Sequence, residues 1–514
     1  MSKKLEIMDT TLRDGEQTSG VSFSPTEKLN IAQMLLEEVK VDRIEVGSAR
    51  VSEGEFEGVK KIVEWGSKAG YLDRIEVLSF IDKNISIDWI KAAGVKVANL
   101  LTKGSLRHLE GQLRKTPQEH LNDIIYCIEY ANKNGINVNV YLEDWSNGIQ
   151  NSRDYVIFLM DNLIKYPIKR FMLPDTLGVL NPDKTYEYIK FMTERYPGVH
   201  FDFHPHNDYD LATANVFAAI KAGVQGIHTT VNGLGERAGN VPLSSVIAII
   251  LDHFKYDLSI NEKKIYSISK LVETFSGIRI PPNKPVIGDN VFTQTCGVHA
   301  DGDRKDNLYQ NDLDPERFGR VRKYALGKTA GKANIVKNLE ELGIRLTEEE
   351  IKKVTERVIE LGDKKETITT EDLPYIVSDV LNSELIQQKI RVINYSLSTV
   401  NGLKSVATLK IEINGDVYEE TACGDGQYDA FMKALKKIYE LLGREIPRLV
   451  DYVVTIPPGG RTDALVETVI TWEYSKDGRE LKTRGLDPDQ TVAAIKSTLK
   501  MLNIIEQDNF FKKI

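Results

Sequence analysis

A chain of 514 residues, 41% of them hydrophobic and 28% charged, has the composition of an ordinary globular protein and is long enough for two or three domains. Its net charge of −8, with acidic and basic residues well mixed, argues against nucleic-acid binding as the main function. Its three widely separated cysteines exclude a disulfide framework, and no apolar run is long enough for a membrane span or a signal peptide, so we expect a cytoplasmic protein.

The first half of the chain alternates short apolar strands with helical segments. Eight strands are predicted, at residues 5–8, 43–46, 75–80, 95–101, 136–142, 170–173, 199–203 and 226–231. This rhythm predicts an α/β fold, a (β/α)₈ TIM barrel over residues 1–260. A doubly wound sheet is the alternative, but its first strand should lead into a glycine-rich turn, whereas this chain continues with Leu12-Arg13-Asp14-Gly15.

Beyond the barrel two further regions are predicted. Residues 261–388 lack the strand rhythm and should form mostly helical linking subdomains. Residues 389–514 should form a C-terminal α+β domain of two βββα units, with strands at 390–397, 406–413 and 417–423 and a helix at 428–442, then strands at 449–456, 464–473 and 480–483 and a helix at 489–502. Each unit buries only one face of its sheet, so the two should pack together and present a dimer interface.

Two histidines end the seventh predicted strand, in the run His204-Pro205-His206. Residues i and i+2 of a strand point to one face, here at the barrel end where catalytic groups gather. In a closed barrel the seventh, eighth and first strands follow one another, so Asp14, both histidines and a side chain of the glycine-containing loop 232–240 can converge on one ion. Such ligands suit Zn²⁺, Mn²⁺ or Co²⁺; a polar cluster without metal is the alternative.

Three separated motifs resemble those of a known family. The runs at residues 12–17, 204–208 and 232–240 resemble signatures of the acyl-CoA-dependent Claisen condensing enzymes, the isopropylmalate, citramalate and homocitrate synthases. The duplicated C-terminal unit is similar to the regulatory domain of the isopropylmalate and citramalate members. The resemblance spans essentially the whole chain and implies condensation of acetyl-CoA with a 2-oxoacid at a divalent metal ion, either one of those above or Mg²⁺.

The resemblance also implies roles for residues on the barrel. Four of them would bind the metal: Asp14, His204, His206 and Asn240. Arg13 would stabilise the oxyanion, and Thr176, after the sixth strand, would hold the carboxylate of the 2-oxoacid. These assignments place the reaction at the carboxyl ends of the barrel strands.

The proton of the acetyl-CoA methyl group requires a base. By resemblance this base is His299, in Gly297-Val298-His299, and Glu143 or a water between them would orient it. Tyr309 would enter from the partner chain of a homodimer, because it lies beyond the barrel in sequence. Each active site would then be completed by the neighbouring subunit.

The choice of 2-oxoacid is predicted from three residues near strand ends, Leu78, Leu101 and Tyr141. Their bulk leaves room for a methyl group more readily than for an isopropyl group, and they carry no positive charge for a dicarboxylate. The expected substrate is therefore pyruvate, as in the citramalate-type members. An isopropylmalate synthase acting on 2-oxoisovalerate is the alternative within the family.

The C-terminal repeat indicates feedback control by an amino acid. Six residues at its turns and facing elements could enclose the effector: Tyr428, Asp429, Tyr452, Thr462, Pro488 and Gln490. A citramalate-type enzyme would respond to isoleucine and an isopropylmalate synthase to leucine. Dimerisation without a ligand, a non-catalytic amino-acid sensor and an aldol-cleaving lyase are the remaining alternatives.

Overall fold

The structure is a computed structural model that describes residues 5–256, 258–342, 344–363, 368–381, 389–455, 466–473 and 480–506. The chain divides into two compact units. The first comprises Met1–Phe292 and Asn311–Val321, and the second comprises Thr293–Gln310 and Arg322–Ile514. No helix in the described ranges is long and apolar enough to cross a membrane.

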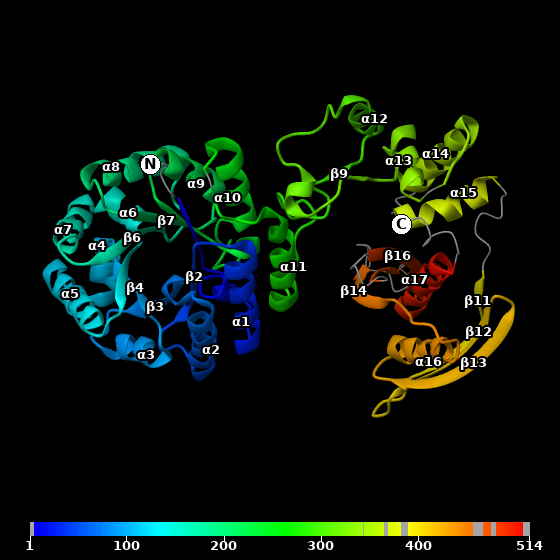
Figure 1. Ribbon diagram of the computed structural model, residues 1–514, viewed down its shortest axis with the longest axis horizontal. Helices are drawn as coiled ribbons and strands as arrows, with labels where there is room; N and C mark the ends of the chain where they lie inside the picture. Colours follow the sequence, from blue (N-terminus) through cyan, green and yellow to red (C-terminus); the bar gives the residue numbers. More distant parts are fainter. Residues whose placement is uncertain are drawn as a thin grey trace. The chain divides into compact units, whose positions relative to one another are not determined.

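The first unit contains a closed barrel of eight parallel strands in sequence order (Figure 1). The strands are β1 (Glu6–Asp9), β2 (Arg43–Ser48), β3 (Ile75–Phe80), β4 (Val97–Lys103), β5 (Asn137–Glu143), β6 (Ile168–Asp175), β7 (Phe201–Pro205) and β8 (Gly226–Thr229). Strand β1 pairs with both β2 and β8, which closes the barrel. The predicted TIM barrel is therefore confirmed, and the doubly wound sheet is excluded.

Helices surround the barrel (Figure 1). They are α1 (Pro25–Gln33), α2 (Glu53–Ala69), α3 (Ile85–Ala93), α4 (Leu106–His108), α5 (Pro117–Lys133), α6 (Trp145–Asn151), α7 (Arg153–Leu163), α8 (Pro182–Arg195), α9 (Ala212–Lys221), α10 (Leu243–Ile249) and α11 (Ile265–Ser276). Helix α1 begins with a capping box, in which the Ser24 hydroxyl accepts from the Glu27 amide and the Glu27 carboxylate accepts from the Ser24 amide. The cap fixes the chain between the carboxyl end of β1 and its helix.

The barrel strands have an apolar outer face and a partly polar inner face. On β2, Ile44 packs in the core beneath the helices, whereas the adjacent Arg43 and Glu45 are buried and bond to other strands. Arg43 donates to Glu76 at 3.0 Å, and Glu45 accepts from Asn99 at 2.7 Å. Alternation along a strand sends neighbouring side chains to opposite faces, so a hydrogen-bonded network fills part of the barrel interior.

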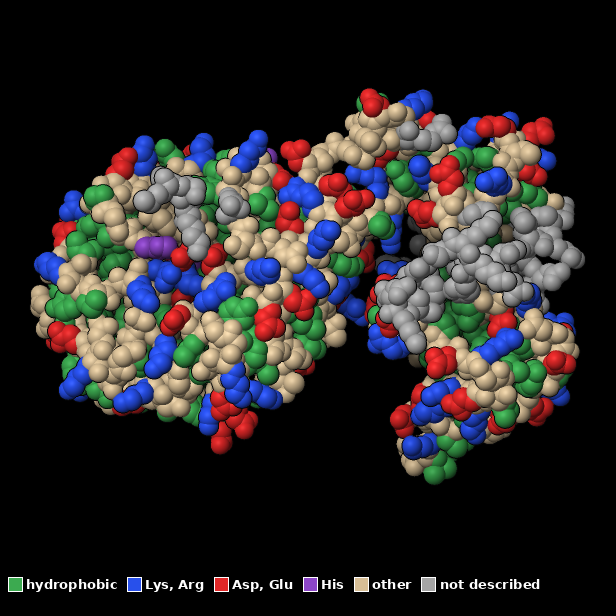
Figure 2. Space-filling view, viewed as in Figure 1, with side chains coloured by type: hydrophobic (Ala, Val, Ile, Leu, Met, Phe, Trp, Pro, Cys, Tyr) green, Lys and Arg blue, Asp and Glu red, His purple; other side chains and the backbone are tan. Residues whose placement is uncertain are grey.

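Short 3₁₀ and π segments interrupt the regular elements of the first unit. They are η1 (Gly15–Gln17), η2 (Met34–Val39), η3 (Leu72–Arg74), η4 (Leu109–Leu113), η5 (Val231–Gly233), η6 (Ile250–Phe254), η7 (Glu262–Lys264) and η8 (Pro315–Phe318). Two of them matter for function: η1 follows Asp14, and η5 opens the glycine loop after β8. Figure 2 shows acidic and basic side chains interspersed over the visible face of this unit, in keeping with the mixed charge of the sequence.

The second unit starts with a mostly helical part. It contains β9 (Thr293–Gln294), α12 (Gly297–Asp306), β10 (Lys323–Tyr324), α13 (Lys332–Glu341), α14 (Glu348–Asp363), η9 (Thr370–Asp372) and α15 (Leu373–Leu381). Strands β9 and β10 pair in parallel. Helices α13, α14 and α15 share an apolar cluster that includes Ile335, Val354 and Val377. This cluster gives the linking segment a core of its own.

The rest of the second unit is the predicted pair of βββα units. The first consists of β11 (Ile390–Ser398), β12 (Ser405–Ile413), β13 (Asp416–Gly424) and α16 (Gln427–Leu441), and the second of β14 (Arg448–Thr455), β15 (Val466–Glu473), β16 (Glu480–Asp487) and α17 (Gln490–Ile505). Each triple of strands forms an antiparallel sheet. Phe431 of α16 and Trp472 of β15 belong to one buried cluster, so the two units share a core as expected.

Candidate metal centre and active site

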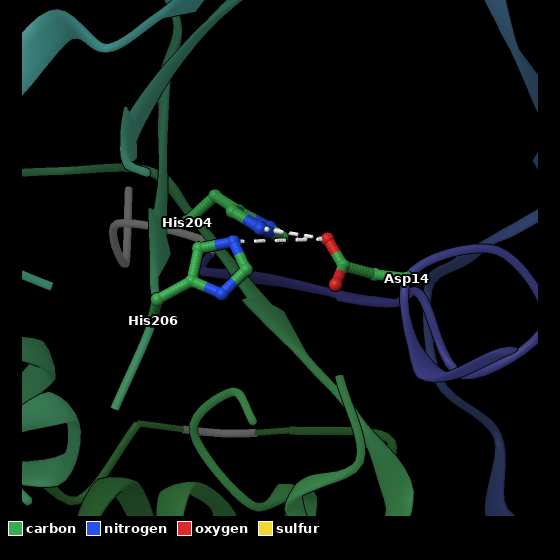
Figure 3. A group of neighbouring side chains, drawn as sticks. All are labelled: Asp14, His204 and His206. Carbon is green, nitrogen blue, oxygen red and sulfur yellow. Dashed lines mark ion pairs between the residues drawn. The ribbon is translucent and has the colours of Figure 1, made fainter. Parts of the chain in front are cut away.

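Three predicted metal ligands converge at the carboxyl end of the barrel. Asp14 lies in the turn after β1, His204 is the fourth residue of β7, and His206 follows directly after that strand. Figure 3 shows both imidazoles turned toward the Asp14 carboxylate. The distance from Asp14 Oδ2 is 3.1 Å to His204 Nε2 and 4.0 Å to His206 Nε2.

These side chains have the geometry and protonation of a metal centre. Their potential ligand atoms all lie within 4.8 Å of one another, and ligands bound at about 2.1 Å to one ion are separated by roughly 3–4 Å. Burial lowers the pKa of both histidines, that of His206 to about 4, so that each offers a neutral nitrogen. Burial alone would raise the pKa of Asp14, but the Arg13 guanidinium holds it well below its usual range.

The fourth predicted ligand, Asn240, lies beside Asp14. Its amide nitrogen donates to Asp14 Oδ1 at 2.9 Å and to the carbonyl of Leu234 at 3.1 Å. Its buried Oδ1 meets no hydrogen-bond partner among the described residues, as a ligand oxygen awaiting an ion would. Gly235 has φ +151°, and a Cβ there would lie 2.2 Å from the Asn240 amide nitrogen, so the loop needs glycine to come this close. A divalent ion therefore fits this set of residues.

Arg13 is fixed on three sides next to this centre. Its Nε lies 2.5 Å from Glu45, its Nη1 lies 2.8 Å from Asp14, and its Nη2 lies 3.4 Å from the Tyr141 hydroxyl. Burial would lower the pKa of Arg13, but Glu45 and Asp14 raise it above its usual value. The site thus holds a permanent, oriented positive charge, which is what stabilisation of a developing oxyanion requires.

The predicted substrate wall forms one apolar cluster inside the barrel. Leu78, Tyr141 and Leu101 pack there with two residues that the sequence analysis did not single out, Met8 and Met172. Tyr141 places this cluster next to the candidate metal ligands, because its ring centroid lies 6.0 Å from that of His204. Alternation along the strands could have identified them, because Met8 on β1 and Met172 on β6 occupy positions that face the barrel interior.

Thr176 and Glu143 lie at the same end of the barrel. The Thr176 hydroxyl oxygen accepts from the Asp144 amide at 2.9 Å, which fixes its position, and the carbonyl of Thr176 accepts from Arg237 at 2.8 Å. The Glu143 carboxylate forms an ion pair with Lys103. Thr176 keeps its hydroxyl proton available, whereas Glu143 already has a cationic partner.

Sequence reasoning missed His228, a buried histidine on β8 beside His204. Its Nδ1 lies 3.3 Å from His204 Nδ1 and 3.1 Å from the Tyr141 hydroxyl, and its Nε2 lies 3.0 Å from Asp202. The strand register would have identified it. Phe203 pairs with Ile227, so the next residues, His204 and His228, are neighbours on adjacent strands.

His299 and Tyr309 belong to the second unit. His299 lies on α12, and its ring stacks on that of Tyr309 with centroids 4.1 Å apart. The amide of Tyr309 donates to Asp303 at 3.1 Å. Their roles in catalysis therefore stay predictions drawn from the motif Gly297-Val298-His299.

Two of the predicted effector residues come together in the C-terminal domain. The ring centroids of Tyr428 on α16 and Tyr452 on β14 are 5.5 Å apart, and the Tyr428 hydroxyl lies 2.7 Å from that of Thr498. The Asp429 carboxylate accepts hydrogen bonds from the Asp425 amide in the preceding turn and from the Lys433 ammonium group. Pro488 and Gln490 flank the start of α17, and Thr462 lies outside the described residues.

Three family models match consecutive parts of the chain. The HMGL-like family matches residues 4–272, the homocitrate synthase post-HMGL domain-like family matches residues 286–366, and the LeuA allosteric (dimerisation) domain matches residues 367–506. The first covers the barrel, and the last covers the two βββα units. The description of the last family names dimerisation and allosteric control.

Curated relatives match over nearly their whole length. The (R)-citramalate synthase CimA of Methanocaldococcus jannaschii is 36% identical over 98% of this chain and 99% of its own. The 2-isopropylmalate synthase of Pyrococcus furiosus is 34% identical over 99% of this chain and 100% of its own, and that of M. jannaschii is 33% identical over 98% and 95%. The chain therefore belongs to the family of citramalate and isopropylmalate synthases, acyltransferases that condense acetyl-CoA with a 2-oxoacid.

Proposed function

We propose that the chain is an (R)-citramalate synthase for isoleucine synthesis. It would condense acetyl-CoA with pyruvate, and water would hydrolyse the resulting thioester to (R)-citramalate and CoA. The observation that carries this choice is the cluster of Met8, Leu78, Leu101, Tyr141 and Met172 beside the candidate metal centre. Five large side chains in contact leave little room for the isopropyl group of 2-oxoisovalerate. Sequence identity does not distinguish pyruvate from 2-oxoisovalerate as the substrate, because citramalate and isopropylmalate synthases match this chain almost equally well.

The proposed mechanism gives each barrel residue one task. Asp14, His204, His206 and Asn240 would hold a divalent ion, Mn²⁺, Zn²⁺, Co²⁺ or Mg²⁺, which would polarise the keto group as a Lewis acid. Arg13, whose guanidinium lies beside Asp14, would stabilise the negative charge that develops on that oxygen. Thr176 would donate its hydroxyl proton to the carboxylate of pyruvate, since its oxygen already accepts from a backbone amide.

The base is proposed to be His299, acting with Tyr309. Because the two rings stack within one chain, both would serve the same active site. In the proposed homodimer, His299 and Tyr309 of one subunit would complete the active site on the barrel of the other subunit. The match to the LeuA dimerisation domain supports such an assembly. His299 would remove a proton from the acetyl methyl group, and Glu143 of the barrel would help to orient it.

Release of CoA thiol from acetyl-CoA with a panel of 2-oxoacids tests the proposed function. We expect release with pyruvate to exceed that with 2-oxoisovalerate and 2-oxoglutarate. Preference for 2-oxoisovalerate would instead identify an isopropylmalate synthase. No release with any 2-oxoacid would contradict catalysis altogether and favour a non-catalytic sensor.

Substrate choice should respond to Leu101 of β4. Leu101→Ala enlarges the proposed wall, and kcat/KM for 2-oxobutanoate relative to pyruvate should rise by about tenfold or more, because one methylene in such a pocket is worth roughly 10–200-fold. The matched control is Leu100→Ala on the same strand, since Leu100 packs toward the helices instead. It should cost about 2–5 kcal/mol of stability and leave the ratio of kcat/KM values unchanged. If both variants had the same ratio of kcat/KM for 2-oxobutanoate to that for pyruvate, Leu101 would not line the substrate pocket.

The C-terminal domain is proposed to bind isoleucine as a feedback inhibitor. Tyr452→Ala removes the ring that packs on Tyr428, so the isoleucine concentration for half-inhibition should rise by about tenfold, equivalent to 1.4 kcal/mol of binding, with kcat unchanged. Tyr395→Ala, which removes a ring packed on Phe431 in the same domain, is the control and should keep inhibition intact. Inhibition of the unmodified protein by leucine and not by isoleucine would contradict this assignment.

A further inference from the structure

A line of hydrogen bonds crosses the barrel interior and ends on the candidate ligand His204. Arg43 Nη2 lies 2.6 Å from Asp202 Oδ2, which lies 3.0 Å from His228 Nε2. His228 Nδ1 in turn lies 3.3 Å from His204 Nδ1. The other nitrogen of His204, Nε2, faces Asp14 Oδ2 at 3.1 Å. All five side chains are buried.

The position of His204 sets the direction of the hydrogen bonds. Its Nε2 faces Asp14 Oδ2 at 3.1 Å, so Nε2 is the nitrogen that would bind the ion, and an imidazole that binds an ion through Nε2 carries its proton on Nδ1. That Nδ1 faces His228 Nδ1 at 3.3 Å, so the His228 nitrogen is the acceptor. His228 then carries its own proton on Nε2, which faces Asp202 Oδ2 at 3.0 Å.

The same arrangement places two ligand atoms side by side. With its proton on Nδ1, His204 presents a bare Nε2 at 3.1 Å from the Asp14 oxygen, and ligands bound to one ion are separated by roughly 3–4 Å. The Tyr141 hydroxyl lies 3.1 Å from the same His228 nitrogen and 3.4 Å from Glu45 Oε2, and its one proton can serve either acceptor.

We propose that Asp202 and His228 are positioning residues for the metal ion: they hold His204 as the tautomer protonated on Nδ1, so that its Nε2 is preset as a ligand. The proposal rests on the metal site proposed above. It gives a role to the buried residues Arg43, Asp202 and His228, which take part in no step of the proposed condensation. Outer partners of this kind fix the ring orientation of a ligand and typically change metal affinity by about 10–100-fold when they are replaced.

Two substitutions at His228 separate its two hydrogen bonds. His228→Gln keeps a donor near the position of Nε2, toward Asp202, but has no acceptor where Nδ1 lies; His228→Asn keeps an acceptor at that place. The probe is Mn²⁺, added to metal-stripped protein while the free ion is measured by electron paramagnetic resonance. We expect His228→Gln to bind Mn²⁺ about 10–100-fold more weakly, and His228→Asn to stay within about threefold of the unmodified protein.

Asn139→Leu is the matched control for disturbance of the barrel interior. Asn139 is equally buried and bonds to Glu76 and Asn99, but it contacts none of the proposed ligands. It should lower thermal stability and leave Mn²⁺ affinity unchanged. Unchanged affinity in His228→Gln would overturn the positioning role while leaving the metal site intact, whereas no Mn²⁺ binding by the unmodified protein would overturn the metal site as well.

The tautomers can also be read directly, should His228→Gln fail to fold. In the full-length protein labelled with ¹⁵N-histidine and loaded with Zn²⁺, nitrogen chemical shifts identify which ring nitrogen carries the proton. We expect His228 protonated on Nε2 alone and His204 protonated on Nδ1 alone. A His228 protonated on Nδ1 would overturn the proposal.

Discussion

Replacement of Asp14 by alanine is expected to abolish metal binding and nearly all condensation activity. Asp14 is the one anionic member of the candidate ligand set, and both histidines and Asn240 lie against it. Loss of a bound Lewis acid removes several kcal/mol of charge stabilisation, so kcat should fall by roughly 10³-fold or more. The measurements are the metal content after dialysis and the rate of CoA thiol release with pyruvate.

Asp208→Ala is the control for this substitution. Asp208 belongs to the same His-Pro-His-Asn-Asp run, but its carboxylate pairs with Arg237 near the surface, at 2.7 Å. This variant should retain the metal. If Asp14→Ala kept both the metal and the rate of the unmodified protein, the candidate centre would not be the catalytic one.

The second large effect is expected from Arg13→Lys. A lysine keeps the charge but cannot reproduce the planar guanidinium that contacts Glu45, Asp14 and Tyr141 at once. Misplacement of the charge should lower kcat by about 10²–10³-fold, as for loss of one oxyanion-stabilising donor, and should change KM for acetyl-CoA little. Steady-state kinetics with both substrates varied provide the measurement.

Arg74→Lys is the matched control. Arg74 precedes β3 at the opposite end of the barrel, where it donates to the carbonyls of Asp42 and Val41. Its replacement should affect stability and leave kcat unchanged. A similar loss of kcat in both variants would mean that Arg13 acts through the fold instead of through the reacting oxygen.

Much of the fold could be predicted because the signals were local. The eight barrel strands are short apolar runs between amphipathic helices, and each predicted strand overlaps one observed strand. The C-terminal units were predicted from alternating strands that recur in the same order. Strand ends differ: the last strand continues to Asp487, beyond its predicted end at residue 483.

The candidate ligands could be predicted because three motifs fall on adjacent strands of a closed barrel. The supporting network could not be predicted in the same way. Glu45, Asp202 and His228 stand singly in apolar runs, and their partners come from strands far away in sequence. What they share is a polar side chain that points into the barrel from a strand buried on both faces. This feature can be recognised only once the register of the barrel strands is known.

Formation of the new carbon–carbon bond tests the central claim most directly. Pyruvate labelled with ¹³C at its keto carbon and acetyl-CoA labelled at its methyl carbon are incubated with the full-length protein, and the products are examined by ¹³C nuclear magnetic resonance. We predict citramalate in which the two labelled carbons are coupled, formed when Mn²⁺ is present and lost after chelation. Release of CoA accompanied by free acetate and unchanged pyruvate would contradict the account, because it would show hydrolysis without condensation.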